Sequence, residues 1–144
     1  TDPRDRLALN SRFGQWMNHR IIRYADVLLM AAEAANELGG DQNMQDALGW
    51  LEQVRARARG NNANILPKVT TTSQVDLRNA IRHERFVELA MEEQRFYDLV
   101  RWRIDIQVLR DQEGKVLYNE KKRLLPIPQG EIDKSGGVLE QNPL

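Results

Sequence analysis

Two adjacent segments with helical spacing, joined by a short link that contains a glycine pair, constrain this fold more than any other feature. The first runs from Arg20 to Leu38 and stops at Gly39-Gly40; the second runs from about Asn43 to Arg59 and stops at Gly60-Asn61-Asn62. Glycine directly after a helical pattern is a typical helix stop. Because the link is short, the two helices are predicted to form an antiparallel hairpin.

The first of these helices is predicted to be buried over most of its circumference. Its polar positions fall along one side, while apolar and small residues fill the remaining directions. The small residues would let a neighbouring helix approach closely. The polar positions are Arg23, Asp26, Glu33 and Glu37, and the apolar ones include Tyr24, Ala25, Leu28, Leu29, Ala32 and Ala35.

Two more helical segments follow a loop that contains Pro67. A third helix is predicted from Ser73 to about Glu93, because Ser73 with Asp76 three residues later resembles a capping box. A fourth is predicted from about Arg95 to Arg103. No glycine or proline separates the third from the fourth, so one long bent helix remains an alternative.

The C-terminal part of the chain favours irregular structure. The segment Leu109 to Tyr118, with Gly114 at its centre, is compatible with a small β-hairpin. From Leu124 onward, repeated prolines and glycines exclude a long helix. The expected fold is therefore all-α, with tetratricopeptide-like helical hairpins and an irregular, extended C-terminal tail. Residues 1–19 are expected to form an irregular N-terminal segment.

Composition removes several functional classes. Lys plus Arg equals Asp plus Glu, at 21 each, so the basic excess typical of nucleic-acid binders is missing. The chain has no cysteine, which excludes disulfides, thiolate nucleophiles and cysteine-ligated zinc. The longest apolar run, Val27 to Ala32, is far shorter than the roughly 20 residues that a membrane span needs. The sequence implies no cofactor.

A row of acids on the third helix is the most informative charged feature. Glu84, Glu88 and Glu92 are spaced four residues apart and line up with the apolar stripe of that helix. Aligned acids repel one another and need partners if they are buried. The chain holds 16 Arg and 5 Lys, and Arg suits fixed pairing with carboxylates. The available cations are Arg23, Arg55, Arg57, Arg85 and Arg95, which favours a structural salt-bridge network.

Two catalytic readings of the same acids compete with that network. A carboxylate metal site in a helical bundle typically uses a Glu-x-x-His motif, with His three residues after Glu, on each of two helices. Here the histidine of the third helix, His83, comes directly before Glu84, so no metal site is expected. A glycosidase pair such as Glu88 with Glu92 remains as a weak alternative, because the sequence does not give the separation of the carboxylates.

Aromatic side chains are the candidates for contact with sugar rings. Core or helix–helix roles are favoured for Tyr24, Trp50, Tyr97 and Trp102, which lie inside helical patterns. Trp16 and Tyr118 lie outside firm helices and are the better candidates for ligand binding.

Three motifs, in order, resemble the C-terminal portion of the SusD/RagB family. The first is Arg23-Tyr24-Ala25-Asp26-Val27-Leu28-Leu29-Met30 followed by Ala32-Glu33-Ala34 and Asn36-Glu37. The second is Glu84-Arg85, Glu88-Leu89-Ala90, Glu92, Arg95 and Asp98-Leu99-Val100-Arg101-Trp102. The third is Leu125-Pro126-Ile127-Pro128, Glu131-Ile132 and Gln141-Asn142-Pro143. The resemblance covers residues 20–144, which are expected to form one helical domain.

The resemblance implies a non-catalytic lipoprotein on the extracellular face of a Gram-negative outer membrane. Such proteins capture oligosaccharides, or in some cases peptides, for import by a TonB-dependent, SusC-like transporter, and a lipid anchor holds the full-length protein to the membrane. Members are several times longer than this chain, so a C-terminal fragment is expected. The Asp2-Pro3-Arg4 turn lies closer to Arg23 than in the family, so the region between is expected to be shortened.

The motif residues match scaffold positions of the family, and no ligand contact carries over to them. The predicted salt-bridge network comprises Arg23, Asp26, Glu84, Arg85, Glu88, Glu92, Arg95, Asp98 and Arg101. The function expected from the sequence is nutrient binding without turnover. A helical protein–protein interaction scaffold without a glycan site is the alternative, and a glycoside hydrolase is a weak third.

Overall fold

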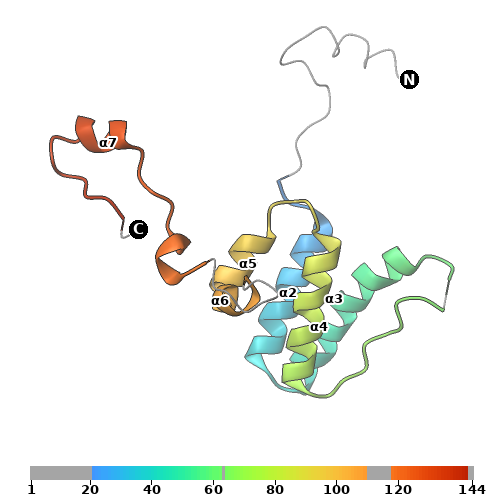
Figure 1. The fold of residues 1–144 in the computed structure, drawn as a ribbon. Coiled ribbons are helices and arrows are strands. Elements are labelled where there is room, and N and C mark those ends of the chain that lie inside the picture. The colour runs from blue at the N-terminus through green and yellow to red at the C-terminus, as the bar shows by residue number, and fades with distance from the viewer. Residues whose placement is uncertain (1–20, 63, 110–117, 143–144) are drawn as a thin grey trace, which may run out of the picture. The chain divides into compact units, whose positions relative to one another are not determined.

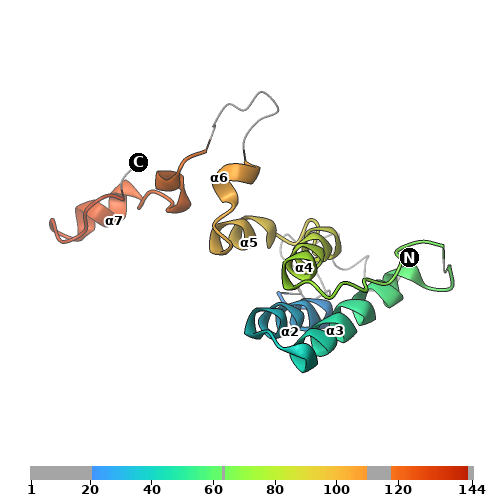
Figure 2. The same cartoon turned by 90° about the horizontal axis from the view of Figure 1, so that it is seen from below.

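A computed structural model describes residues 21–62, 64–109 and 118–142. The chain divides into two compact units, Thr1–Glu88 and Leu89–Leu144, and each unit is considered by itself. The described part of the first unit contains α2 (Tyr24–Leu38), α3 (Asp41–Arg59) and α4 (Gln74–Glu88), shown side by side in Figures 1 and 2.

The predicted hairpin between the first two helices is confirmed. Gly39 and Gly40 both adopt left-handed backbone angles, with φ of 72° and 86°, which a residue with a Cβ atom adopts only with strain. The Gly39 amide donates to the Ala35 carbonyl and closes α2, and the Asn43 side chain donates to the Gly39 carbonyl from the first turn of α3. The chain therefore reverses within two residues.

The third helix is antiparallel to α2 and parallel to α3. Its first residue, Gln74, exchanges hydrogen bonds with Asn36 near the end of α2, and its last residue, Glu88, contacts Arg23 at the start of α2. The loop that follows α3 thus carries the chain back along the bundle before α4 begins, as Figure 2 shows. The predicted cap is confirmed, because Ser73 Oγ accepts a hydrogen bond from the Asp76 amide at 3.2 Å.

Apolar side chains from α2, α3 and α4 form one core. Every core residue falls at helical spacing, which explains why these three segments form amphipathic helices. Leu29 of α2, Leu51 of α3, and Leu77 and Ile81 of α4 are essentially inaccessible to solvent. The buried cluster comprises Leu28, Leu29, Ala32, Ala35, Ala47, Leu51, Val54, Leu77 and Ile81.

The prediction that this third helix continues to about Glu93 is wrong, because α4 ends at Glu88. Met91 and Glu93 take left-handed backbone angles, with φ of 65° and 63°, so the helix cannot continue through them. The Arg23 side chain donates to the Glu88 carbonyl at 2.8 Å, and so satisfies a carbonyl that a helix end leaves without a partner. A side chain that is distant in sequence thus takes the place of a glycine or proline stop.

The second unit contains shorter elements. These are α5 (Arg95–Arg101), α6 (Asp105–Val108), a 3-10 turn η1 (Glu120–Arg123) and α7 (Gln129–Lys134). Two amide side chains tie the proline-rich tail to itself. Gln141 accepts from the Ile127 amide and donates to its carbonyl, at 2.8 and 2.9 Å, and Asn142 donates to the Leu125 carbonyl. The first and last parts of the third sequence motif are thereby joined.

The all-α fold class is confirmed, since the described residues form helices, turns and irregular segments without a strand. The β-hairpin considered for Leu109 to Tyr118 falls almost wholly on residues outside the described ranges, as does the irregular segment 1–19.

Leu29→Ala should lower the free energy of unfolding of the first unit by about 2–5 kcal/mol, because it leaves a cavity among α2, α3 and α4. Leu38→Ala is the matched control on the same helix. Leu38 is 78% exposed, so its truncation should cost about 0.5 kcal/mol or less. Urea unfolding followed by circular dichroism measures both variants, and equal losses would contradict the assigned core.

Candidate functional site

The side chain of Glu88 is the point where α2, α3 and α4 are joined. Arg23 Nη1 donates to Glu88 Oε1 at 2.8 Å, and Arg57 Nη2 lies 2.7 Å from each carboxylate oxygen. The Glu88 side chain is only 7% exposed. A carboxylate removed from water in this way costs free energy unless it is paired, and here two guanidinium groups pair it.

Two more buried acids of the same unit also meet arginine. Glu84 of α4 accepts from Arg55 Nη1 of α3 at 2.6 Å, and Arg55 donates in turn to the Pro67 carbonyl in the loop. Asp26 of α2 accepts from Arg85 Nη1 of α4 at 2.8 Å, and both of these side chains are more than nine-tenths buried. The ends of α2, α3 and α4 near Glu88 are thus linked by charged pairs.

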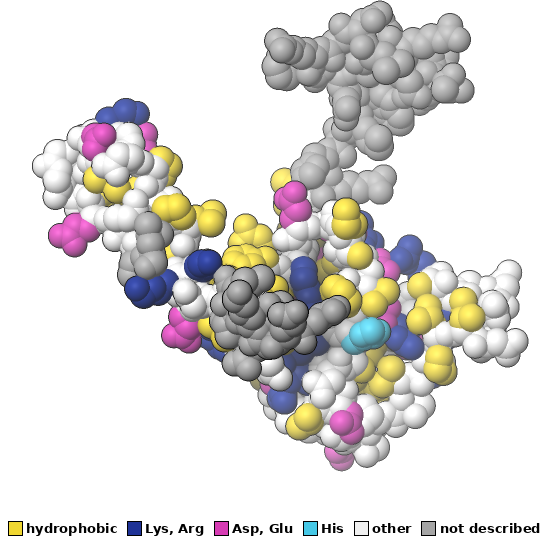
Figure 3. Space-filling model, in the orientation of Figure 1, with side chains coloured by type: hydrophobic (Ala, Val, Ile, Leu, Met, Phe, Trp, Pro, Cys, Tyr) yellow, Lys and Arg dark blue, Asp and Glu magenta, His cyan; other side chains and the backbone are white. Residues whose placement is uncertain are grey.

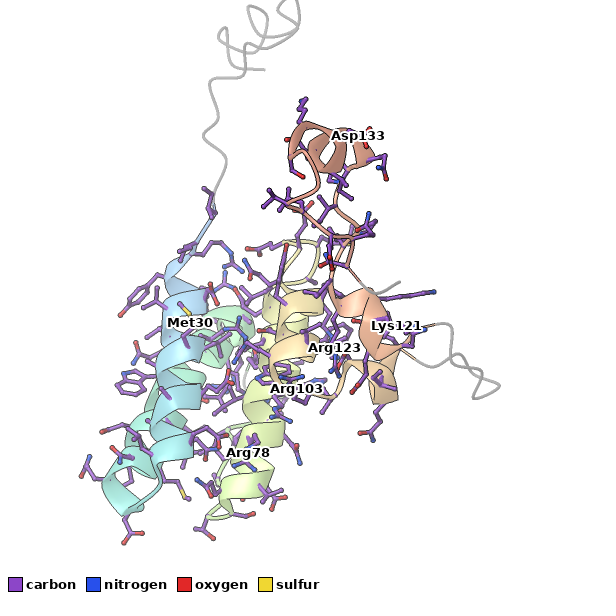
Figure 4. The ribbon with its side chains drawn as sticks, turned by 90° about the vertical axis from the view of Figure 1, so that its left-hand side faces the viewer. Met30, Arg78, Arg103, Lys121, Arg123 and Asp133 are labelled. Carbon is purple, nitrogen blue, oxygen red and sulfur yellow. The ribbon has the colours of Figure 1, made fainter. Side chains whose placement is uncertain are left out.

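Polar contacts at the opposite end of the bundle are less buried. Arg78, labelled in Figure 4, donates to the Glu37 carboxylate from α4. This hydrogen bond lowers the pKa of Glu37 below its usual value, and the positive charge of Arg78 lowers it further. Partial burial of Glu37 acts in the opposite direction but is outweighed. In the last turn of α3, at the Glu88 end, a hydrogen bond from the Arg59 guanidinium likewise lowers the pKa of Glu52, and Arg59 also donates to the Leu66 carbonyl.

A groove opens between the start of α2 and the last turns of α3. Its volume is about 310 Å³, near the lower limit for small-molecule sites. The floor is apolar, and polar or amphipathic side chains line the rest. The lining residues are Arg23, Tyr24, Ala25, Leu28, Gln53, Val54 and Arg57. Two of them, Arg23 and Arg57, are the arginines that hold Glu88.

The second unit contains a separate buried acid, Asp105. Its two carboxylate oxygens accept from Arg123 Nε at 2.6 Å and from Arg123 Nη2 at 2.8 Å, in bidentate geometry (Arg123 is labelled in Figure 4). The hydrogen bonds from Arg123 outweigh burial and lower the pKa of Asp105, whereas the same pairing raises the pKa of Arg123. No spacing pattern in the sequence predicts this pair, because its members lie 18 positions apart in a segment without a helical period.

Tyr118, one of the two predicted ligand-contact residues, lies beside Asp105. Its hydroxyl is buried and makes no hydrogen bond of good geometry with the described residues. Burial, followed by the Asp105 carboxylate, raises the pKa of Tyr118. Its ring packs edge-to-face on Phe96, with centroids 6.0 Å apart. The other predicted contact, Trp16, lies outside the described residues.

The structure distributes the predicted salt-bridge residues over both units. Arg23, Asp26, Glu84, Arg85 and Glu88 meet in the first unit, together with Arg55 and Arg57. In the second unit, Asp98 pairs with Arg101 at 2.9 Å, and Arg95 begins α5. Glu92 lies in the exposed turn after α4 rather than on the helix, so the expected row of three acids is reduced to Glu84 and Glu88.

Neither catalytic reading of the acids gains support from this geometry. Both oxygens of Glu88 are held by arginine, and Glu92 is not on its helix. Within the described ranges, no cluster of three or more His, Cys, Asp or Glu side chains is arranged to hold a metal ion. His83, the cyan side chain in Figure 3, is exposed on α4.

Two aromatic residues differ from the expectation that they are buried. Tyr24 is 72% exposed and Tyr97 is 70% exposed, whereas Trp50 packs against the core. The sequence pattern of α2 is apolar over most of its circumference, but α3 and α4 cover only part of that apolar surface. None of the helices seen in the described part is long and apolar enough to cross a membrane.

Helices fixed by buried charge pairs, with a groove and irregular segments beside them, define an all-helical scaffold. The chain belongs to the SusD family, whose sequence model matches residues 10–144. It is 33% identical over 131 residues to SusD-like protein P2 and 37% identical over 139 residues to SusD-like protein P25, both of Formosa agariphila. These alignments cover 88% and 91% of the chain but 26% and 25% of the relatives, so the chain spans about a quarter of their length.

Solved structures show the same relationship. A SusD-like protein from Bacteroides fragilis superposes with a TM-score of 0.66 at 30% identity, and covers 85% of this chain and 25% of that one. Surface glycan-binding protein A from Bacteroides thetaiotaomicron gives a TM-score of 0.64 at 34% identity, with 85% and 24% covered.

Glu88→Gln should lower the free energy of unfolding by about 1.5–3 kcal/mol, since it weakens charge-assisted hydrogen bonds to two arginines. Glu37→Gln, which removes the same charge at the more exposed Arg78 pair, should cost about 0–1 kcal/mol. Thermal and urea unfolding provide the comparison. An unchanged melting temperature for Glu88→Gln would argue against a bracing role for this side chain.

Acid should destabilise the second unit through Asp105. Its folded-state pKa is lowered, so its contribution is complete above the unfolded-state value of about 3.9 and is lost as pH falls through the folded-state value. NMR peak intensities of α5 and α6 in urea, measured from pH 6 to pH 2, follow this loss. Asp105→Asn should be less stable at pH 6 and lack that part of the pH dependence; a variant with the wild-type profile would exclude Asp105 as its source.

Proposed function

We propose that the protein carrying this chain is a nutrient-binding protein that captures oligosaccharides without altering them. Membership of the SusD family over residues 10–144 is the observation that carries this proposal. The similarity to a surface glycan-binding protein supports a saccharide ligand in particular. Peptides are the other ligand class compatible with the family.

The described helices suit a supporting role. Their buried acids already have arginine partners, and such pairs hold helix ends in fixed positions rather than performing chemistry. In this proposal Arg23, Asp26, Glu84, Arg85 and Glu88 keep the first unit rigid, and Asp98 with Arg101 does the same locally in α5. Loops and outer faces would then present the groups that contact ligand.

The proposed location is the extracellular face of the outer membrane, where a lipid anchor of the full-length protein would hold it. There it would deliver its ligand to a TonB-dependent, SusC-like transporter. In the same proposal residues 20–144 act as one helical domain of that longer protein, with residues 1–19 as an irregular segment before it.

One observation favours a second candidate, a helical protein–protein interaction scaffold without a glycan site. The uncovered side of α2 exposes large apolar residues, which are more frequent at protein contacts than on free surfaces. These residues are Tyr24, Val27, Met30 and Leu38, and Figure 4 labels Met30 among them.

Two measurements on the full-length protein separate these candidates. Purified from outer membranes in mild detergent, it should bring a TonB-dependent transporter with it, and on a glycan array it should retain oligosaccharides. Chromatography of the recovered ligand should show unchanged chain length. Shortened products would contradict a non-catalytic role, and transporter or protein capture without any glycan or peptide binding would favour the interaction scaffold.

A further inference from the structure

The turn after α4 forms where the amino acids themselves favour helix. Residues 88–95 read Glu-Leu-Ala-Met-Glu-Glu-Gln-Arg, and every one of these residue types is a strong helix former. Neither glycine nor proline interrupts them. Yet α4 ends at Glu88 and α5 begins at Arg95, and Figure 1 shows them as separate helices. A contact from outside the segment must therefore oppose its local preference.

Two residues of this turn adopt strained backbone angles. Met91 and Glu93 have φ of 65° and 63°, and a residue with a Cβ atom adopts this left-handed region at a cost of roughly five- to thirtyfold in population. Packing of their side chains does not offset this cost, because Met91 is 100% exposed and Glu93 is exposed as well. The conformation of the turn is therefore held from elsewhere.

The Glu88 carbonyl is the group for which the turn and a longer helix compete. In a continuing α-helix it would accept a hydrogen bond from the Glu92 amide, four residues later. In the structure it accepts from Arg23 Nη2 at 2.8 Å, and the Glu92 amide donates to the Leu89 carbonyl at 3.2 Å, in the tighter spacing of three residues. Arg23 thus occupies the acceptor on which the next helical turn would be built.

Arg23 contacts the side chain and the main chain of Glu88 at once. Its Nη1 donates to Glu88 Oε1 at 2.8 Å, while Nη2 donates to the carbonyl. The side chains of Arg23 and Glu88 are only 24% and 7% exposed, so water competes weakly for these bonds. Because the guanidinium is a rigid planar fork, the bond to the carboxylate also positions the donor that reaches the carbonyl.

We propose that Arg23 controls a two-state segment at the end of α4. While Arg23 holds the Glu88 carbonyl, residues 89–93 form the left-handed turn; when Arg23 is withdrawn, α4 continues through these residues as the helix that their sequence favours. Such a device needs two conformations of similar free energy and one contact that favours only one of them. Arg23 thereby couples the start of α2 to the first residues of the second unit, whether or not a ligand is bound.

A matched pair of substitutions at Glu93 tests which conformation the segment adopts. Glycine is favoured over alanine at a left-handed position, whereas alanine is favoured over glycine in a helix, by roughly fivefold in population in either case. In the full 144-residue chain, Glu93→Gly should therefore melt about 2–8 °C above Glu93→Ala. In the Arg23→Gln background this order should reverse, because residues 89–93 are then helical.

NMR spectroscopy reads the backbone of the segment directly. At positive φ the amide proton lies close to the Hα of its own residue, so Met91 and Glu93 should give strong intraresidue NOEs in the wild type and weak ones in Arg23→Gln. Arg78→Gln removes an arginine at the opposite end of the bundle and should leave both NOEs strong. Arg23→Lys keeps the charge but replaces the fork with a single ammonium, and should shift the NOEs partway. It serves as the test if circular dichroism shows that Arg23→Gln is unfolded.

Each result either supports or overturns control by Arg23. Glycine melting above alanine in both backgrounds, or strong NOEs at Met91 and Glu93 that survive both Arg23 variants, would show a turn that does not depend on Arg23. Alanine melting above glycine in the wild-type background would contradict the strained turn itself. Neither result affects the proposed nutrient-binding function, which the ligand-binding measurements on the full-length protein decide.

Discussion

The carboxylate of Glu88, held by Arg23 and Arg57, is the interaction on which the rest of the first unit depends. It stands at the last residue of α4 and receives one arginine from the start of α2 and one from the end of α3. Arg23 also donates to the Glu88 carbonyl, so the same residue neutralises the acid and terminates the helix. The position where α4 ends, and hence where the second unit begins, follows from a contact between residues 65 positions apart.

Elements whose signals are local can be predicted from the sequence, whereas features set by contacts between distant residues cannot. The glycine pair Gly39-Gly40 indicated the hairpin, because glycine is the residue that adopts the positive φ angles found there without strain. Ser73 indicated a helix start, because its side chain can accept a hydrogen bond from the amide three residues later, and Asp76 donates that bond. Glu93 was expected to be helical because no local signal opposes it, whereas Arg23 decides where α4 ends. For Tyr24, a helix pattern that is apolar on most sides indicated burial, but the pattern does not show how much of α2 its neighbours cover. The pairing of Asp105 with Arg123 crosses a segment without period, so no spacing rule could predict it.

Buried ion pairs seldom add net stability over well-packed apolar side chains, so their value here is better sought in register. Two of the four residues that α2 contributes to the core are alanines, Ala32 and Ala35, and small side chains interlock less with a neighbouring helix than large ones do. Arg23 with Glu88 and Asp26 with Arg85 fix one end of this contact, while Asn36 with Gln74 fixes the other. A shift of α4 by one turn would leave each of these buried groups without its partner, at a cost of about 1–3 kcal/mol or more apiece. We infer that the charged pairs select one alignment of α4 on α2 among several that the apolar core alone would permit.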